Sequence, residues 1–244
     1  MNDIFNRVEL LAGREGLERL RQARVIIFGL GGVGSWAAES LARTAIGHIT
    51  LVDADDVAPT NINRQLPALL STVGQPKVDI IARRIADINP QCEVVARRER
   101  YTAETAESFE IRSFDYCIDA IDSVADKAAL IVEATSQTRP RLFSSMGAAL
   151  RCDPTRVTTA EFRRVEGDAL AAALRRRFRK TDIWPRHKFR CVYSTEQPRR
   201  NASVEAAADG AMTYGKVAVN GALCHVTAIF GMTLAGLVVN DIIG

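Results

Sequence analysis

The sequence predicts an α/β fold with a mostly parallel β-sheet and helices on both faces. Two observations predict it. Short apolar runs typical of buried strands alternate with segments of helix length, and a glycine-rich turn joins one such strand to the helix that follows. The 244 residues, 47% hydrophobic and 25% charged, suffice for a substantial core and exclude collagen-like, disordered and disulfide-scaffold classes.

The expected elements follow one another without internal repeats. Strands are predicted at 24–29, 48–53, 93–97, 116–121 and 141–145, and helices at 7–23, 35–44, 78–88, 103–112 and 124–137. Beyond Gly147 the pattern changes to an alternating edge or antiparallel strand at 156–162, a basic helix at 168–179, a short strand at 190–194 and a polar loop at 196–212. We expect one domain over 1–244, with a nucleotide-binding core at 7–147, a basic substrate-binding elaboration at 151–215 and an apolar C-terminal helix at 217–244.

The residues from Val217 to Asn240 carry no formal charge and are long enough to cross a bilayer. Three glycines interrupt this run, and polar side chains such as His225 would be costly among lipids. We therefore expect a helix buried against the sheet or at a subunit interface, with a membrane span as the alternative.

Cysteine usage and the N-terminus both indicate the cytoplasm. The five cysteines are scattered and form no C-x-x-C pair, so a reducing compartment is expected and structural zinc is not. The first residues contain charges and lack the long apolar run of a secretory signal.

Positive charge is concentrated in one segment, although the net charge is only +3. Ten Lys or Arg residues lie between Arg163 and Arg190, against three acidic residues. This pattern indicates either a polyanionic partner or a solvated helix face.

The turn Gly29-Leu30-Gly31-Gly32-Val33-Gly34 has the G-x-G-x-x-G spacing of a phosphate-binding site. Glycines let backbone approach phosphates closely, and the start of the next helix offers free N–H groups and positive potential. Asp53, at the end of the second strand, is placed to accept hydrogen bonds from ribose hydroxyls. These features fit a dinucleotide as well as ATP.

The residues that follow favour a triphosphate. Cleavage between its α and β phosphates needs cations and a carboxylate for Mg²⁺, which Arg64, Lys77 and Asp122 supply. Each also has a simpler interpretation. Arg64 could pair with Asp55 or Asp56, Lys77 could be a solvated helix-cap residue, and Asp122-Ser123 could cap the next helix.

The combination G-x-G-G-x-G, D-x-D, N-x-N-R-Q, G-Q-x-K and D-x-x-D resembles the ubiquitin-activating-enzyme-like (ThiF/MoeB/HesA) adenylyltransferases, over about residues 7–147. That resemblance implies ATP and Mg²⁺ as cofactors and transfer of AMP to a carboxylate. It also implies that Arg7 is lent to the neighbour's ATP across a homodimer. The implied site residues are Gly29, Gly31, Gly32 and Gly34 at the phosphates, Asp53 at the ribose, Asn61, Arg64, Gln65 and Lys77 at the nucleotide, and Asp122 at Mg²⁺.

The lead-in and the C-terminal part resemble one branch of this family, the tRNA threonylcarbamoyladenosine dehydratases. The similar segments are 13–17, 152–157 and 189–196, whereas 145–150 is less glycine-rich than in relatives. The resemblance implies ATP-dependent dehydration of N6-threonylcarbamoyladenosine next to the anticodon, and a sulfur-relay protein of the cysteine-desulfurase type as a further partner. The alternatives are an adenylyltransferase for a sulfur-carrier protein and a nucleotide-sensing or membrane-anchored module.

The basic segment fits a tRNA substrate, because the phosphates of an anticodon stem-loop attract Lys and Arg side chains. The residues chosen as backbone contacts are Arg175, Arg176, Arg177, Arg179 and Lys180. Phe178, Phe189 or Tyr193 could stack on a base, although core packing is the commoner use of an aromatic. Cys191 is a candidate nucleophile, but its apolar strand favours a buried, inert thiol.

Overall fold

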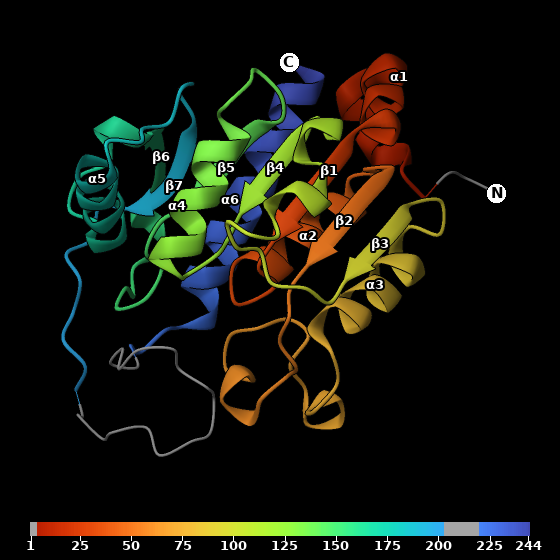
Figure 1. Cartoon of the computed structure of the whole chain (residues 1–244). Helices are drawn as coiled ribbons and strands as arrows, with labels where there is room; N and C mark the ends of the chain where they lie inside the picture. Colours follow the sequence, from red (N-terminus) through yellow and green to blue (C-terminus); the bar gives the residue numbers. More distant parts are fainter. Residues whose placement is uncertain (1–3, 203–219) are drawn as a thin grey trace.

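One seven-stranded sheet organises the chain, in the order β3-β2-β1-β4-β5-β7-β6 (Figure 1). The structure is a computed structural model that describes residues 4–202 and 220–244. The strands are β1 (Arg24–Phe28), β2 (His48–Val52), β3 (Glu93–Arg97), β4 (Tyr116–Asp119), β5 (Arg141–Ser145), β6 (Val157–Glu161) and β7 (Arg190–Ser194). Neighbours are parallel except β6 and β7, which confirms the predicted fold class and the antiparallel C-terminal strand.

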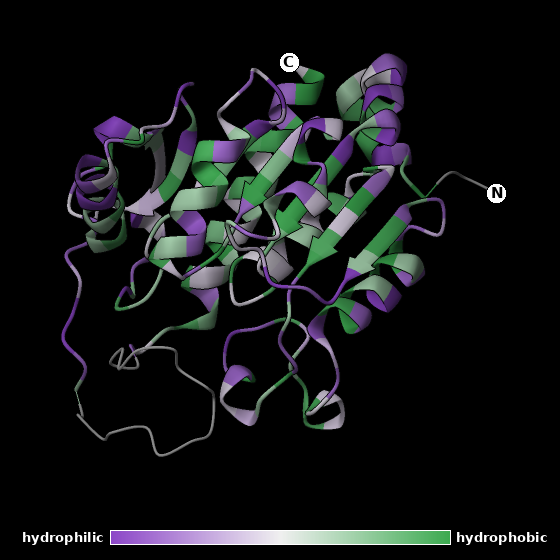
Figure 2. Ribbon diagram, viewed as in Figure 1, coloured by the Kyte–Doolittle hydropathy of each residue, from purple (hydrophilic) through white to green (hydrophobic). Residues whose placement is uncertain are grey.

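Helices cover both faces of the sheet. They are α1 (Asn6–Gln22), α2 (Gly34–Arg43), α3 (Lys77–Ile88), α4 (Val124–Ala134), α5 (Ala169–Thr181) and α6 (Cys224–Ile243). One core cluster joins α1, α2, α3 and α6 to the sheet, and a second joins α4 and α5 to its other face. The strands between these layers are mostly apolar, whereas α5 carries a strongly hydrophilic outer surface (Figure 2).

Two predicted elements differ from the structure. The helix expected at 103–112 is two short 3-10 helices, η3 (Ala106–Phe109) and η4 (Ile111–Ser113), with Glu110 between them in a left-handed conformation. The apolar helix begins at Cys224 and runs to Ile243, later than expected from composition. Part of the predicted loop at 196–212 and the first residues of the apolar run lie outside the described residues.

Helix α6 is the one described helix that is long and apolar enough to cross a membrane. In this structure its Val226, Phe230, Leu234 and Val238 belong to the core on the α2 side of the sheet. Its other side leaves Ile229 and Met232 exposed. The buried face agrees with a helix that packs against the sheet.

The strand order reverses between β1 and β4, because β1, β2 and β3 run outward on one side and β4 begins the other side. In such sheets, ligands bind where strands end on either side of this reversal. We call the edge where the parallel strands end the carboxyl edge, and the opposite edge the amino edge.

Candidate functional site

The glycine-rich turn lies at the reversal point and is packed against the end of β4. Gly29 has φ +87°, and a Cβ there would lie 2.7 Å from the carbonyl oxygen of Ala120. A Cβ on Gly34 would lie 1.8 Å from the carbonyl oxygen of Gly29. Only glycine fits either position, so α2 begins directly against the strand, beside the loop that follows β4.

The first turn of α2 is open to a ligand. No side chain caps this helix. A Cβ on Gly31 would meet only the Nε2 atom of Gln65, at 3.8 Å. Gln65 is buried, and its Oε1 atom has no hydrogen-bond partner among the described residues. An uncapped helix start fits the phosphates of a nucleotide, and the unpartnered Gln65 oxygen, which is an acceptor, fits a hydrogen-bond donor of the same ligand, such as a hydroxyl or amino group.

Asp53 ties the second strand to this turn. Its Oδ2 accepts a hydrogen bond from the Leu30 amide at 2.6 Å, and its Oδ1 accepts one from the Asp55 amide at 2.8 Å. Burial raises the pKa of this carboxyl, while the charge of Lys77 and the two amides act in the opposite direction. Asp53 therefore holds the glycine turn in shape and also lies where a ribose would bind. The sequence predicted the second role but not the first.

Lys77 is buried, which excludes the interpretation as a solvated helix cap. It begins α3, and its side chain is 5% exposed although its partner Asp55 is 71% exposed. The Nζ atom lies 2.8 Å from Asp55 Oδ2. A buried ammonium held by an exposed carboxylate at the carboxyl edge can exchange that partner for a phosphate.

Arg64 lies beside the glycine turn and is paired with neither Asp55 nor Asp56. Its Nη1 donates to the Thr60 carbonyl and to Asn63 Oδ1, both at 2.9 Å, and its Cγ is 3.3 Å from a Cβ built on Gly32. Asn61, in contrast, turns toward its own loop, since its Oδ1 accepts from the Ala58 amide.

Asp122 is exposed and follows β4. It lies two residues after Ala120, whose carbonyl oxygen packs against Gly29 of the glycine turn. It forms no ion pair with any described residue. Ser123 stands at the N-cap of α4 but makes no side-chain capping bond. Residues 4–202 and 220–244 hold no group of three or more metal-ligating side chains. A single carboxylate fits Mg²⁺ only together with nucleotide phosphates, which is how this ion is commonly held.

Beneath Asp122 lies an ion pair that the sequence did not predict. Lys127 Nζ is 2.8 Å from Asp119 Oδ2, and both side chains are 0% exposed. Asp119 ends an otherwise apolar strand and is aligned with Ser144, whose hydroxyl donates to it at 2.7 Å. The one sequence feature that could have indicated this ion pair is the charged residue Asp119 inside the apolar run at 116–121.

Arg7 lies in the first turn of α1, and this helix lies at the amino edge, opposite the carboxyl edge where the glycine turn follows β1 (Figure 1). Arg7 is exposed, next to Phe5, which packs with Leu17 and with Ala45 beyond the end of α2. Within one chain, therefore, it does not join the other predicted site residues.

Of the five residues predicted to contact tRNA, Arg175 is half-buried and the others are exposed. Arg175 donates from Nη1 to the carbonyls of Phe162 and Val165, at 3.2 and 3.0 Å, and thereby ties α5 to the preceding turn. The other four residues predicted to contact tRNA, Arg176, Arg177, Arg179 and Lys180, are exposed. Asp168, the N-cap of α5, accepts a hydrogen bond from the Gly147 amide at the carboxyl edge, so the basic end of the helix points toward the amino edge.

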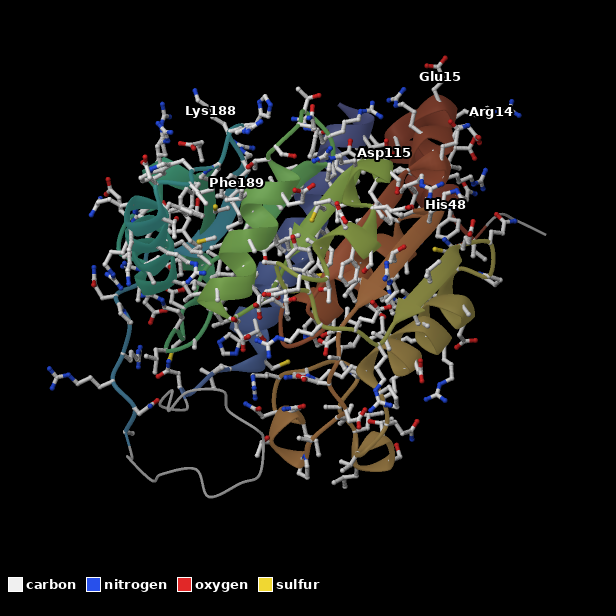
Figure 3. The ribbon with its side chains drawn as sticks, in the orientation of Figure 1. Arg14, Glu15, His48, Asp115, Lys188 and Phe189 are labelled. Atoms are coloured by element: carbon white, nitrogen blue, oxygen red, sulfur yellow. The ribbon has the colours of Figure 1, made fainter. Side chains whose placement is uncertain are left out.

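Figure 3 shows Lys188 at the amino edge of the sheet. Asp115 and His48 lie at the same edge, because Asp115 precedes β4 and His48 begins β2. A cavity of about 540 Å³ lies there, lined among others by Arg141, Phe189 and Asp241. The cavity is thus at the opposite edge from the glycine turn, and we do not assign it to the nucleotide.

The aromatic and thiol candidates are mostly internal. Phe178 and Phe189 are buried in the second core cluster, whereas Tyr193 is half-buried. Cys191 is 0% exposed, and burial raises the pKa of its thiol well above the ordinary value. A neutral buried thiol is inert, in agreement with the simpler interpretation.

Comparison with known proteins gives consistent matches along almost the whole chain. The ThiF family model matches residues 5–243. A Bacillus subtilis protein named tRNA threonylcarbamoyladenosine dehydratase is 44% identical over 242 residues, which cover 98% of this chain and 94% of the relative. Crystal structures of Escherichia coli tRNA N6-threonylcarbamoyladenosine dehydratase in complex with ATP and with AMP superpose with TM-scores of 0.85 and 0.86, at 35% and 36% identity. Each match covers 98% of this chain and 93% of the other.

Proposed function

The chain belongs to the ThiF family, and from that premise we propose that it catalyses ATP-dependent dehydration of N6-threonylcarbamoyladenosine next to the anticodon of tRNA. The observation that carries the proposal is that the uncapped glycine turn, Asp53 with the nearby charge of Lys77, and Asp122 all follow strands at the carboxyl edge, around the reversal point of the sheet. The similarity to dehydratases extends through the C-terminal part of the chain, beyond the nucleotide-binding core.

ATP binds along the carboxyl edge. The first turn of α2 donates its free N–H groups to phosphate oxygens, and Asp53 accepts from the ribose while it holds Leu30 in place. Arg64 and Lys77 supply the cations that the triphosphate requires. The full set of nucleotide contacts that we propose is Gly29, Gly31, Gly32, Gly34, Asp53, Asn61, Arg64, Gln65 and Lys77.

Asp122 would hold Mg²⁺ together with the phosphates, and the ion, when bound, would supply positive charge against the departing pyrophosphate. The chain's own contribution is an exposed carboxylate that has no competing ion pair among the described residues.

The reaction has two balanced steps. A carboxylate oxygen of the modification attacks the α-phosphorus of ATP, and pyrophosphate leaves. A nitrogen or oxygen of the same modification then attacks the activated carbonyl, AMP leaves with the former carboxylate oxygen, and a proton is released, so the nucleoside loses the elements of water. Holding the attacking group close lowers the barrier by up to ~7–11 kcal/mol in ideal cases, and no enzyme nucleophile is needed.

The wider assembly is also part of the proposal. The exposed basic side chains of α5 contact tRNA phosphates, and the enzyme works in the cytoplasm as a homodimer. Arg7 supports the dimer, because at the amino edge it can serve only a neighbour's site, and Leu10 and Leu11 beside it are 81% and 86% exposed. A sulfur-relay partner rests on the family resemblance alone.

The test is incubation with ATP, Mg²⁺ and threonylcarbamoylated tRNA, followed by mass analysis of the nucleosides. We expect the modified adenosine to lose the mass of one water, with AMP and pyrophosphate formed in equal amounts. An unchanged nucleoside, together with AMP transfer to a sulfur-carrier protein, would contradict the proposal.

A further inference from the structure

The buried pair of Asp119 and Lys127 is a costly feature in an otherwise apolar core. Both side chains are fully buried among residues such as Phe28, Cys117 and Cys191. Taking two charges out of water costs several kcal/mol per ion, and well-packed apolar replacements of such pairs are often neutral or stabilising. Stability is therefore a weak explanation for an ion pair at this place.

The hydrogen bonds of the pair point to a different explanation. Asp119 Oδ1 accepts from the Ile121 amide at 3.1 Å, and Lys127 Nζ donates to the Ile121 carbonyl at 3.0 Å. The peptide groups on both sides of Ile121 are therefore fixed, and the second of them joins Ile121 to Asp122. Ser144 Oγ holds the other oxygen of Asp119 at 2.7 Å.

The same short loop also supports the glycine turn. The position of a Cβ on Gly29 lies 2.7 Å from the Ala120 carbonyl oxygen and 3.3 Å from the Ile121 nitrogen. A movement of Ile121 would therefore change the place of Asp122 relative to the phosphates that the turn is proposed to bind.

We propose that Lys127, together with Asp119, is a positioning residue that holds the Ile121–Asp122 peptide so that the Asp122 carboxylate faces the metal-bound nucleotide. The inference rests on the proposed function in one respect, the role of Asp122. Lys127 itself touches neither substrate nor metal, and its effect is transmitted through one backbone carbonyl.

A double variant separates positioning from stability. Asp119→Leu with Lys127→Met removes both charges together, so no unpaired charge stays buried, and it removes both bonds to Ile121. We expect the unfolding free energy to fall by no more than about 1–3 kcal/mol, because the removal of two buried charges offsets part of the cost of the partners lost by Ser144 and Ile121. In the nucleotide-free protein, amide hydrogen exchange at 120–123 should be faster, because the loop has lost its anchors.

Calorimetry gives a second measurement that does not depend on turnover. The Mg²⁺ concentration that half-saturates the increase in ATP affinity should rise by ~10–100-fold, as is common when a group that orients a metal ligand is lost. ATP affinity without Mg²⁺ should stay within about twofold of the wild type. Asp241→Asn is the matched control, since it removes an ion pair with Arg141 at the amino edge and should move neither quantity.

Three results would contradict the inference: slow exchange retained at 120–123, an unchanged Mg²⁺ dependence, or an equal loss of ATP affinity with and without Mg²⁺. If the double variant does not fold, Ser144→Ala removes one bond to Asp119 and should raise the half-saturating Mg²⁺ concentration by about 2- to 5-fold, an unchanged value again being contrary. Failure of wild-type enzyme to convert the tRNA would count against the proposed function instead, and Asp122→Ala tests the role of Asp122 separately.

Discussion

Asp53 and Asp122 both follow strands at the carboxyl edge, yet their surroundings differ. Asp53 accepts hydrogen bonds from two backbone amides and helps to build the glycine turn. Asp122 is exposed and has no ion pair within the described part of the chain. Substitution should therefore separate chemistry from folding at Asp122 but not at Asp53.

Asp122→Ala should lower the rate of AMP formation by at least ~10²-fold. The variant lacks the carboxylate that would hold Mg²⁺, and the ion would no longer offset the charge on the leaving pyrophosphate. Its thermal unfolding midpoint should match the wild type. Asp53→Ala should lower both activity and the midpoint, since two amides lose their acceptor. An unfolded Asp122→Ala protein, or a fully active one, would count against the assignment.

The order of motifs along the chain predicted which residues meet, since Gly29, Asp53 and Asp122 each follow a strand of one parallel sheet. Side-chain pairs that form only through three-dimensional packing could not be predicted from the order of motifs. The pairing of Asp119 with Lys127 depends on the sheet register that buries Asp119 beside Ser144 and on the packing of α4. Arg175 turns inward because the turn after β6 places two carbonyls within its reach.

At the scale of elements, α2 and α3 are joined through the nearly buried carboxylate of Glu39. Arg84 donates to it from α3 at 2.7 and 3.0 Å, and Arg43 donates from within α2 at 2.8 Å. Burial acts to raise the pKa of Glu39, but the hydrogen bonds and charges of the two arginines bring it below its ordinary value of 4.5.

This lowered pKa predicts a pH-dependent contribution to stability. A carboxyl with a lower pKa in the folded state stabilises the fold above its unfolded pKa, and the contribution is lost as pH falls through the folded pKa. Glu39→Gln should therefore cost about 1–3 kcal/mol at pH 7 and progressively less below pH ~4.5. Urea unfolding between pH 7 and 3 measures this, with exposed Glu107→Gln as control. A difference that stays constant with pH would exclude a carboxylate effect.

Helix α6 meets α2 at a point where only glycine fits. A Cβ on Gly231 would lie 2.3 Å from the Val33 carbonyl oxygen, at the end of the glycine turn, whereas a Cβ on Gly236 would meet nothing within 4 Å. Composition predicted the apolar run but not this contact, because the crossing point depends on how the two helices pack.

Gly231→Ala should destabilise the protein by about 1–3 kcal/mol and weaken ATP binding, since α6 must move away from the turn. Gly236→Ala should be neutral or stabilise by up to ~1 kcal/mol, because alanine is the better helix former. Thermal unfolding and ATP titration of the two variants measure both effects. Equal behaviour of the pair would indicate that α6 does not pack on α2 in solution.

For the whole molecule, the proposed nucleotide site and the exposed basic end of α5 lie toward opposite edges of the sheet. Helix α5, about 20 Å long, carries its exposed arginines away from the carboxyl edge. If the proposed surfaces both engage tRNA, the tRNA must span much of one protomer or contact both protomers of the proposed homodimer.

Arg176→Glu with Arg177→Glu should weaken tRNA binding and reduce the slope of log affinity against log salt by ~2, since two phosphate contacts are lost. ATP affinity should not change. Arg14→Glu, an exposed change on α1, is the control for the charge reversal of one arginine, a net change of −2 against −4 in the double variant. A parallel fall in ATP affinity would show that the basic surface is not a separate RNA site.

The position of Arg7 makes the proposed dimer testable by complementation. If Arg7 serves the neighbour's site, Arg7→Ala and Asp122→Ala proteins should each be inactive alone. When the two are dissociated and mixed equally, half of the dimers are mixed, and each contains one site with both residues intact. About a quarter of wild-type activity should then return, measured as AMP formation. Differently tagged subunits verify exchange, and mixed dimers without recovered activity, or an active Arg7→Ala protein alone, would exclude a role of Arg7 in the neighbour's site.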